Sequence, residues 1–552
     1  MKNVKITFYD GKTMVVPENT QLLELTPLFD PHCFVKTVAA IVDNTITELT
    51  TRITQDCTVQ FLDLANPDGR RIYERSLIFL LIKAVNDLYP ERKVLLQHSV
   101  RHGVYAEITG DQDLLPEELV AIEHRMRSLS EDSIPIIRHK IPMDTAMEIL
   151  NTNERQDLYS AIRERNKPYV IFYDLDGLLD YFYGYMVPHS GYIKDFSLFY
   201  HYPGIIITYP KKELKTKIPL YNDMPKLFSV FSEYKNWGKI LGIENIGEFN
   251  KTIRNQGSAD LIRIAEALQE KKIAQIADAI TRTPEKKKII FVAGPSSSGK
   301  TTFANRLSIQ LRVNGYMTHI LSMDDYFINK SEIPRAEDGS QNWECPEVLD
   351  IALFSAQMKA LIKGQTIDVP VFNFKTGRRE DFSKPLKLAE NQMVIIEGIH
   401  GLNPKITSQI PKEHIYKIYV SPLTSLNIDN HNRIPTTDTR LLRRIVRDNQ
   451  FRAISALETI RMWPSVRNGE EEYIFPYQES CDTMFNSALI YELGALKSNA
   501  LPLLEQIGSD IPEYSEANRL IKFLSYFVPV HTDEIPSNSL LKEFLGGSCF
   551  QD

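Results

Sequence analysis

The chain has 552 residues, with 64 lysines and arginines against 71 aspartates and glutamates, so its formal net charge is −7. This balance excludes a protein-wide basic surface for nucleic acid or anionic membrane, while a local basic patch stays compatible with it. Hydrophobic residues make up 43% of the chain and charged residues 24%, which excludes intrinsic disorder. At about 150 residues per domain, the length predicts three or four domains.

Cellular location is suggested by what the sequence lacks. The 5 cysteines lie far apart and form no CxxC pair, which favours a reducing compartment. The N-terminus has no apolar signal-peptide core, and no apolar run approaches the roughly 20 residues of a membrane span. We therefore expect a cytoplasmic protein without a membrane partner.

Residues 1–64 read as a small β-rich module. Val4, Ile6 and Phe8 alternate with polar residues as in a half-buried strand, and short apolar runs follow at 38–42 and 58–62. The turn-forming sequence NPDG, which begins at Asn66, predicts a domain boundary.

Residues 65–245 read as a larger α+β unit. Helical periodicity covers 76–89, and the stretches 168–174 and 204–209 are typical of strands. A strong amphipathic helix is predicted over 258–283, so that 246–285 reads as a helical linker.

From residue 289 onwards, short apolar strands alternate with helical stretches. Strands are predicted at 289–293, 319–322, 393–396 and 415–420, and a helix at 301–313. Near-continuous apolar strands that alternate with helices indicate a parallel sheet covered on both faces.

A phosphate-binding motif follows the first of these strands. The sequence GPSSSGKT fits GxxxxGK[ST] and lies between a strand and a helix, as that motif requires. Lys300 would supply a charge near the β- and γ-phosphates, and the Thr301 hydroxyl suits Mg²⁺. No DxxG or NKxD sequence follows at the proper spacing, which argues against a GTPase. The residues expected to bind the nucleotide are Gly294, Pro295, Ser296, Ser297, Ser298, Gly299, Lys300, Thr301 and Thr302.

Acidic and basic residues follow the phosphate loop. Asp324 and Asp325 come just after a strand, and Glu397 ends another. A carboxylate at such a place can accept a proton from a hydroxyl or help to hold Mg²⁺. A helical stripe at i, i+3, i+4 and i+7 could form a catalytic lid or a solvated face, and it consists of Arg440, Arg443, Arg444 and Arg447.

The C-terminal motifs together resemble the uridine kinase/phosphoribulokinase family of P-loop kinases. In order they are GPSSSGKT, LSMDDYF, NWECPEVLD, PVFNF, VIIEGI and DTRLLRRIVRD. The resemblance implies transfer of the γ-phosphoryl group of ATP to a 5′-hydroxyl, with Mg²⁺. It implies Asp324 as catalytic base, and Thr301, Asp324 and Glu397 near the metal. It implies catalytic roles for Lys300, Arg443 and Arg447, and an acceptor site of Asp324, Tyr326, Glu344, Phe372, Arg440 and Arg443.

One departure from the family pattern concerns the acceptor. Members that take pyrimidine nucleosides present a Tyr and a His to the base, where this chain has Phe372 and Gly377. The hydrogen bonds that reject wrong bases would be missing, and such bonds carry large discrimination. A non-nucleoside sugar phosphate therefore stays open as the acceptor.

The N-terminal half resembles the front end of threonyl-tRNA synthetases. Residues 1–64 are similar to a TGS domain, a β-grasp module, and 65–245 to the editing domain. The editing domain normally carries two histidines on a helix and a Cys and a His elsewhere, where this chain has Arg75, Phe79, Phe182 and Met186. None of these four can serve as the same metal ligand or base, so hydrolytic editing is not expected.

The sequence thus predicts a multidomain α/β and α+β protein. Its parts are an N-terminal β-grasp domain (1–64), a central α+β editing-like domain (65–245), a helical linker (246–285) and a C-terminal P-loop NTPase domain with a parallel α/β sheet (286–552). The leading prediction is an ATP- and Mg²⁺-dependent nucleoside kinase. The alternative is a regulatory RNA- or tRNA-binding protein that uses ATP as a signal. Binding of RNA or tRNA by the N-terminal half and a homo-oligomeric state both stay open.

Overall fold

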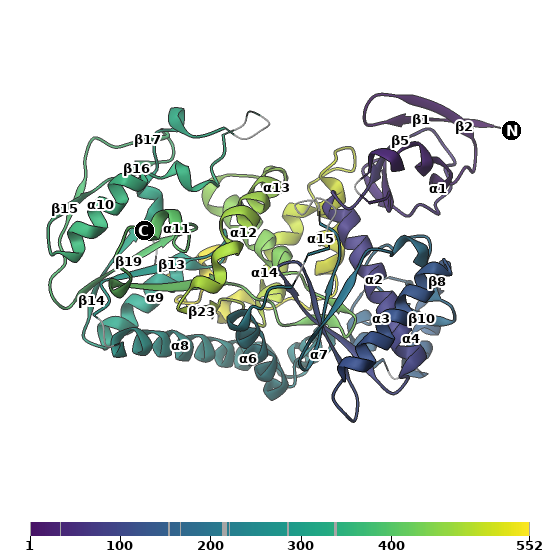
Figure 1. The fold of residues 1–552 in the computed structure, drawn as a ribbon, viewed down its shortest axis with the longest axis horizontal. Coiled ribbons are helices and arrows are strands. Elements are labelled where there is room, and N and C mark those ends of the chain that lie inside the picture. Colours follow the sequence, from purple (N-terminus) through teal and green to yellow (C-terminus); the bar gives the residue numbers. More distant parts are fainter. Residues whose placement is uncertain are drawn as a thin grey trace.

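Figure 1 shows the fold in a computed structural model, with a small N-terminal sheet, a central α+β region and a C-terminal parallel sheet. The structure describes residues 2–33, 35–152, 155–165, 167–211, 218–219, 221–283, 286–335, 339 and 341–550. The C-terminal helices lie between the two larger parts in this view, next to the helix α2.

The N-terminal sheet has five strands in the order β2-β1-β5-β3-β4. Strand β1 pairs parallel with β5 and antiparallel with β2. Val4, Ile6 and Phe8 of β1 point into the core, as their alternation predicts. The elements are β1 (Asn3–Phe8), β2 (Thr13–Pro17), α1 (Leu22–Leu25), β3 (Ala39–Val42), β4 (Thr45–Thr47) and β5 (Cys57–Leu62).

The sequence NPDG begins a helix. Helix α2 (Pro67–Leu88) starts nine residues before the predicted position 76, with Pro67 in its first turn. The Asn66 side chain accepts a hydrogen bond from Asp68 N at 2.8 Å. The same residues that favour turns also favour helix N-termini, because an Asn side chain satisfies a free backbone amide there.

The central region contains two antiparallel sheets. One has the order β10-β9-β8 and the other the order β11-β12-β7-β6. The strands are β6 (Lys93–Val100), β7 (Gly103–Thr109), β8 (Ile136–Pro142), β9 (Tyr169–Leu175), β10 (Leu178–Tyr181), β11 (Ser197–His201) and β12 (Gly204–Thr208). The helices are α2, α3 (Pro116–Glu131), α4 (Met143–Thr152) and α5 (Gln156–Ile162).

The C-terminal sheet is entirely parallel, with the order β14-β19-β13-β20-β23. All five residues of the central strand β13 are buried, as expected when helices cover both faces of a sheet. Its strands are β13 (Ile289–Ala293), β14 (Met317–Ser322), β19 (Gln392–Gly398), β20 (Ile415–Ser421) and β23 (Thr483–Asn486). The short strands beside it are β15 (Ile367–Val369), β16 (Phe372–Asn373), β17 (Arg378–Arg379), β18 (Lys384–Leu386), β21 (Asn427–Asp429) and β22 (Asn432–Arg433).

The helices of this region surround the sheet and continue to the C-terminus. They are α9 (Lys300–Val313), α10 (Ile351–Ile362), α11 (Pro404–Thr407), α12 (Thr436–Arg452), α13 (Ala456–Tyr473), α14 (Glu492–Leu504), α15 (Tyr514–Leu524) and α16 (Lys542–Leu545). No helix in the described part of the chain is long and apolar enough to cross a membrane.

The predicted helical linker is instead packed into the C-terminal core. It follows α6 (Pro225–Leu241) and forms α7 (Ile246–Gln256) and α8 (Ala259–Arg282). Ile273 and Ile280 of α8 belong to the same buried cluster as Phe303 of α9, and α8 runs along the edge of the parallel sheet in Figure 1. The apolar stripe that predicted the helix therefore packs against α9 and the sheet.

Ion pairs join the two halves around the start of α12. Arg71 of α2 contacts Glu516 of α15 at 3.3 Å, and Arg519 of α15 pairs with both Glu516 and Asp438 of α12 at 2.7 and 2.6 Å. Asp438 is 3% exposed, so the pairs on it are shielded from solvent. Further ion pairs join Glu74 to Arg433 and Arg155 to Asp429, and Asp180 is hydrogen-bonded to His431 at 2.5 Å.

Candidate functional site

The phosphate loop connects β13 to α9 at the carboxyl edge of the parallel sheet. Gly299 has φ +85°, and a Cβ added to Gly294 would lie 2.0 Å from Val420 O. Only glycine fits at position 294, because the backbone of β20 approaches it so closely. The loop leads directly into the first turn of a 14-residue helix, where free amides and the helix dipole favour a phosphate group.

Lys300 is the cation at the centre of the site. Its ammonium group donates to Pro295 O at 3.1 Å. Burial lowers the pKa of Lys300, and the nearby carboxylates of Glu397, Glu543 and Asp324 oppose that shift. The lysine is therefore surrounded by acids.

Two of these acids come from neighbouring strands. Ser322, at the end of β14, lies opposite Glu397 of β19 in the parallel register, which brings the following Asp324 to the same edge. Burial raises the pKa of Asp324, with Lys300 acting in the opposite direction. Burial likewise raises the pKa of Glu397 to about 7, while Lys300 and a hydrogen bond from Thr301 lower it. The structure therefore brings Lys300, Thr301, Asp324 and Glu397 together.

Glu344 approaches the same site from the segment before α10. Burial raises its pKa, and the cation that opposes this most is Arg444, with Asp324 also within electrostatic reach. Gly469 of α13 packs on this residue, because an added Cβ would lie 2.3 Å from Glu344 Cβ. The absence of a side chain at 469 thus makes room for the acid.

Two arginines of the predicted lid lie beneath the phosphate loop. Arg440 donates to Ser296 O at 2.9 Å and pairs with Glu470, and both side chains are 1% exposed. Arg443 is fully buried, donates to Glu492 at 2.8 Å and contacts Ser297 O at 3.4 Å.

This placement corrects the solvated-face alternative for Arg440 and Arg443, because both side chains are buried. A helical wheel shows that the four arginines share a face. Only the tertiary structure shows that Glu470 and Glu492 pair with two of them in the core. Arg440 and Arg443 contact the carbonyl side of the loop, and their roles at the acceptor and the transferring group stay predictions.

The remaining arginines of α12 lie nearer the site. Arg444 donates to Ser296 Oγ at 3.1 Å and Arg447 pairs with Asp448 at 2.7 Å. Asp448 is fully buried and also contacts Arg444 at 3.2 Å and Arg452 at 3.7 Å. The acid thus clusters three guanidinium groups beside Lys300 and Asp324.

Two predicted acceptor residues lie in the core instead. The fully buried Tyr326 donates to Gln357 at 2.7 Å, and Phe372 is 6% exposed among Phe327 and Phe374. Their side chains fill the hydrophobic cluster under β16, because both are large and the neighbouring surface is aromatic. The structure gives no support to their role in acceptor binding.

The residues present fit a magnesium nucleotide. Ser297 Oγ and Ser298 Oγ are buried without a hydrogen-bond partner in the loop, as if a ligand were to supply one. Among the described residues, no group of three or more His, Cys, Asp or Glu side chains could hold a metal. A hydroxyl and one or two carboxylates match a Mg²⁺ ion whose other ligands are phosphate oxygens and water.

The editing-like residues of the N-terminal half form a packed core. Phe79 of α2 lies 4.9 Å from Phe182 between ring centres, and Met186 Sδ is 3.5 Å from Ser76 Oγ. Arg75 donates to Tyr185 O at 2.6 Å. Phe79, Phe182 and Met186 therefore belong to one buried apolar cluster, and Arg75 hydrogen-bonds to the backbone of the residue before Met186.

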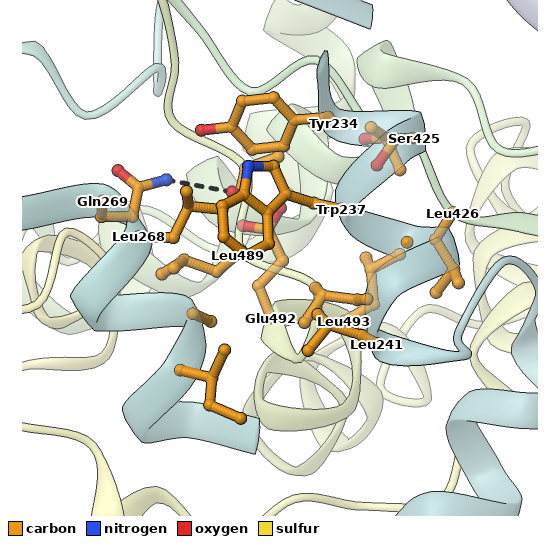
Figure 2. Close-up of a pocket in the computed structure, with 16 residues that line it drawn as sticks. Tyr234, Trp237, Leu241, Leu268, Gln269, Ser425, Leu426, Leu489, Glu492 and Leu493 are labelled. Carbon is orange, nitrogen blue, oxygen red and sulfur yellow. Dashed lines mark hydrogen bonds between the residues drawn. The ribbon is translucent and has the colours of Figure 1, made fainter. Parts of the chain in front are cut away.

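A small cavity lies between α6 and α8 (Figure 2). Its volume is about 50 Å³, and Tyr234 and Trp237 form part of its wall. Ligand pockets for small molecules usually enclose roughly 300 Å³ or more, so this cavity does not hold a nucleotide. Gln269 in its wall donates to Asn486 O at 3.0 Å, which fixes the loop after β23.

Glu543 is the member of the site that the sequence does not reveal. Its carboxylate accepts from Thr302 N at 3.0 Å, although the two residues are 241 positions apart. The C-terminal stretch carries no motif, so no pattern along the chain connects it to the loop.

Comparisons with known proteins relate the two ends of the chain to different families. Residues 289–490 match the model of the Phosphoribulokinase / Uridine kinase family, so this stretch is a domain of that family. The N-terminal part is similar to the threonine–tRNA ligase of Clostridium kluyveri (strain NBRC 12016), with 24% identity over 196 residues, 35% of this chain and 31% of the ligase. The ligase of Bacillus velezensis is 27% identical over 198 residues, 35% of this chain and 30% of that protein. The chain thus spans about a third of the length of these curated relatives.

Two solved structures illustrate the C-terminal likeness. A possible uridine kinase from Bacillus stearothermophilus is 17% identical, covers 39% of this chain and 97% of its own, and has a TM-score of 0.28. The D-glycerate 3-kinase from Cryptococcus neoformans is 13% identical, covers 50% of this chain and 90% of its own, and has a TM-score of 0.21. At these TM-scores the likeness carries no further conclusion.

Proposed function

We propose that the protein transfers the γ-phosphoryl group of ATP to a hydroxyl group of a nucleoside or a related small molecule. The observation that carries this proposal is the meeting of Asp324 and Glu397 with Lys300 at the phosphate loop. A P-loop kinase needs these parts: a cradle for the phosphates, a cation beside them and a carboxylate for the acceptor proton. The family match of residues 289–490 supports the same reaction class.

Each residue then has one task. The loop amides and Lys300 bind the triphosphate and hold its charge in place. Asp324 receives the proton of the acceptor hydroxyl on its carboxylate. Thr301 and Glu397 would hold Mg²⁺, which when bound neutralises charge on the phosphate oxygens. Arg447 lies within electrostatic reach of Lys300, so it would stabilise the negative charge that spreads over the transferring group.

The acceptor is the part of this proposal that needs an experiment. Purified protein should be screened for ADP release with Mg²⁺-ATP across nucleosides and sugar phosphates. Lys300→Ala should abolish any acceptor-dependent release, whereas Lys363→Ala, at an exposed site after α10, should leave it unchanged. No acceptor-dependent release by the wild-type protein, together with no calorimetric binding of Mg²⁺-ATP, would remove the kinase proposal.

For the N-terminal half we propose binding of RNA without hydrolysis. The likeness to threonine–tRNA ligases supports the binding, and the packing of Phe79 against Phe182 argues against the chemistry. Filter binding of tRNA with and without ATP tests this. Tight, ATP-sensitive binding by a protein that releases no ADP would favour the regulatory alternative over the kinase.

A further inference from the structure

The C-terminal segment 540–544 lies directly on the phosphate loop. Within it, Glu543 Oε2 accepts a hydrogen bond from Thr302 N at 3.0 Å. Leu540 lies over the loop itself, since a Cβ built on Gly299 would be 2.7 Å from Leu540 Cδ2. Figure 1 likewise draws the end of the chain over the parallel sheet.

The amide that Glu543 occupies belongs to the phosphate cradle. Thr302 is the third residue of α9, and the first amides of a helix have no partner inside the helix. In a GxxxxGK[ST] loop these amides and those of the preceding turn bind the phosphates of the nucleotide. A carboxylate and a phosphate oxygen would compete for this single N–H, and their negative charges would repel each other.

The surroundings of Glu543 make the competition stronger. Lys300, which must hold the phosphates, has Glu397, Glu543 and Asp324 around it. Glu543 therefore supplies negative charge at the place where a triphosphate would bring its own.

Two apolar side chains hold the segment in this position. Leu540 is fully buried in the cluster that contains Phe303 of α9. Phe544 is also fully buried, and its ring centre lies 4.9 Å from the guanidinium carbon of Arg443. Gly546 and Gly547 follow with φ +86° and +75°, backbone conformations that suit glycine and allow the chain to turn away.

We propose that Glu543 is an autoinhibitory substitute for a nucleotide phosphate, which must leave Thr302 N before the nucleotide binds fully. This inference rests on the proposed kinase function, because it assigns regulation to the same phosphate loop. The competing explanation is that Glu543 only stabilises the start of α9, as acids near helix N-termini commonly do. The two explanations differ in the sign of the effect on nucleotide binding.

The test measures the Kd of Mg²⁺-ADP and Mg²⁺-ATP by calorimetry on the full chain. The variant is Glu543→Gln, and the matched control is Asp533→Asn, which removes one negative charge from an exposed position that precedes the segment 540–544. The amide oxygen that Glu543→Gln introduces can still accept from Thr302 N, but without the negative charge that bond is weaker and the repulsion of a phosphate is gone. The Kd of Glu543→Gln should therefore fall by about tenfold, while Asp533→Asn stays at the wild-type value. Thermal unfolding of the ligand-free variants checks that both are folded.

The outcomes separate the inference from the function on which it rests. Tighter binding by Glu543→Gln alone supports it, as does binding by this variant when the wild-type protein binds nothing. Equal or weaker binding by Glu543→Gln, or equal tightening by both variants, overturns the inference and leaves the kinase proposal standing. No binding by any of the three proteins overturns both.

Discussion

The buried pair of Arg443 and Glu492 gives the sharpest test of how α12 supports the phosphate loop. Replacement Arg443→Met keeps a long apolar side chain but leaves Glu492, which is 2% exposed, without its cation. The guanidinium also donates to Ser487 O at 2.9 Å, so the loop after β23 loses an anchor. Removing one partner of a buried pair costs about 3–5 kcal/mol of unfolding free energy. If residues 286–552 unfold as one cooperative unit, that corresponds to a fall in Tm of roughly 6–10 °C.

The assay is thermal and denaturant unfolding of the wild type and three variants. Arg452→Met is the matched control, because it removes an arginine of the same helix whose side chain is 55% exposed, and it should cost less than about 1 kcal/mol. The double variant Arg443→Met/Glu492→Met should recover most of the loss, because a buried pair replaced by apolar side chains leaves no lone charge. A wild-type Tm for Arg443→Met combined with a turnover loss of orders of magnitude would refute this reasoning. It would restore the arginine to the transferring group.

Three further predictions address the site and its surroundings. Asp324→Asn should lower turnover by about 10²–10⁴-fold with little change in nucleotide affinity, because proton acceptance acts on the chemical step. Steady-state kinetics on the identified acceptor measures this, and normal turnover would contradict it. Gly469→Ala should displace Glu344 and destabilise the protein by about 1–3 kcal/mol, although alanine has the better helix propensity. Denaturant unfolding measures this change, and a gain in stability would contradict the tight contact. His98 has a pKa lowered by burial to about 3, so unfolding exposes a group that binds a proton more tightly, and stability falls as pH drops below about 6.5. Between pH 8 and pH 5 that loss amounts to about 2 kcal/mol, and His98→Phe should abolish it while keeping the stack on Phe231; an unchanged pH profile would exclude this histidine as the cause.

Local sequence patterns predicted much of the fold because they report short-range physics. The apolar run at 289–293 gave the buried central strand, and GPSSSGKT gave the loop and the start of α9. The helix that begins at Pro67 was mispredicted, because turn chemistry and helix capping use the same residues.

The sequence could not show which charges meet across the fold. Arg440 and Arg443 carry the periodicity of an exposed stripe, yet Glu470 and Glu492 neutralise them from α13 and α14. Glu543 lies on the loop only because Leu540 and Phe544 are buried beside it, and no spacing rule encodes such a contact. Acids and arginines are common in any sequence, so their pairing is visible only in three dimensions.

The contacts between the central region and the segment before α12 affect how a chain with these two halves can evolve. Glu74, Asp180 and Arg155 of the central region each pair with a residue of the segment 429–433. A chain cut between the halves would leave Asp429, fully buried, without its arginine partner. Recombination that exchanges one half for an unrelated module would therefore leave these charged groups without partners. The two parts are expected to be inherited together, and compensating substitutions should appear on both sides.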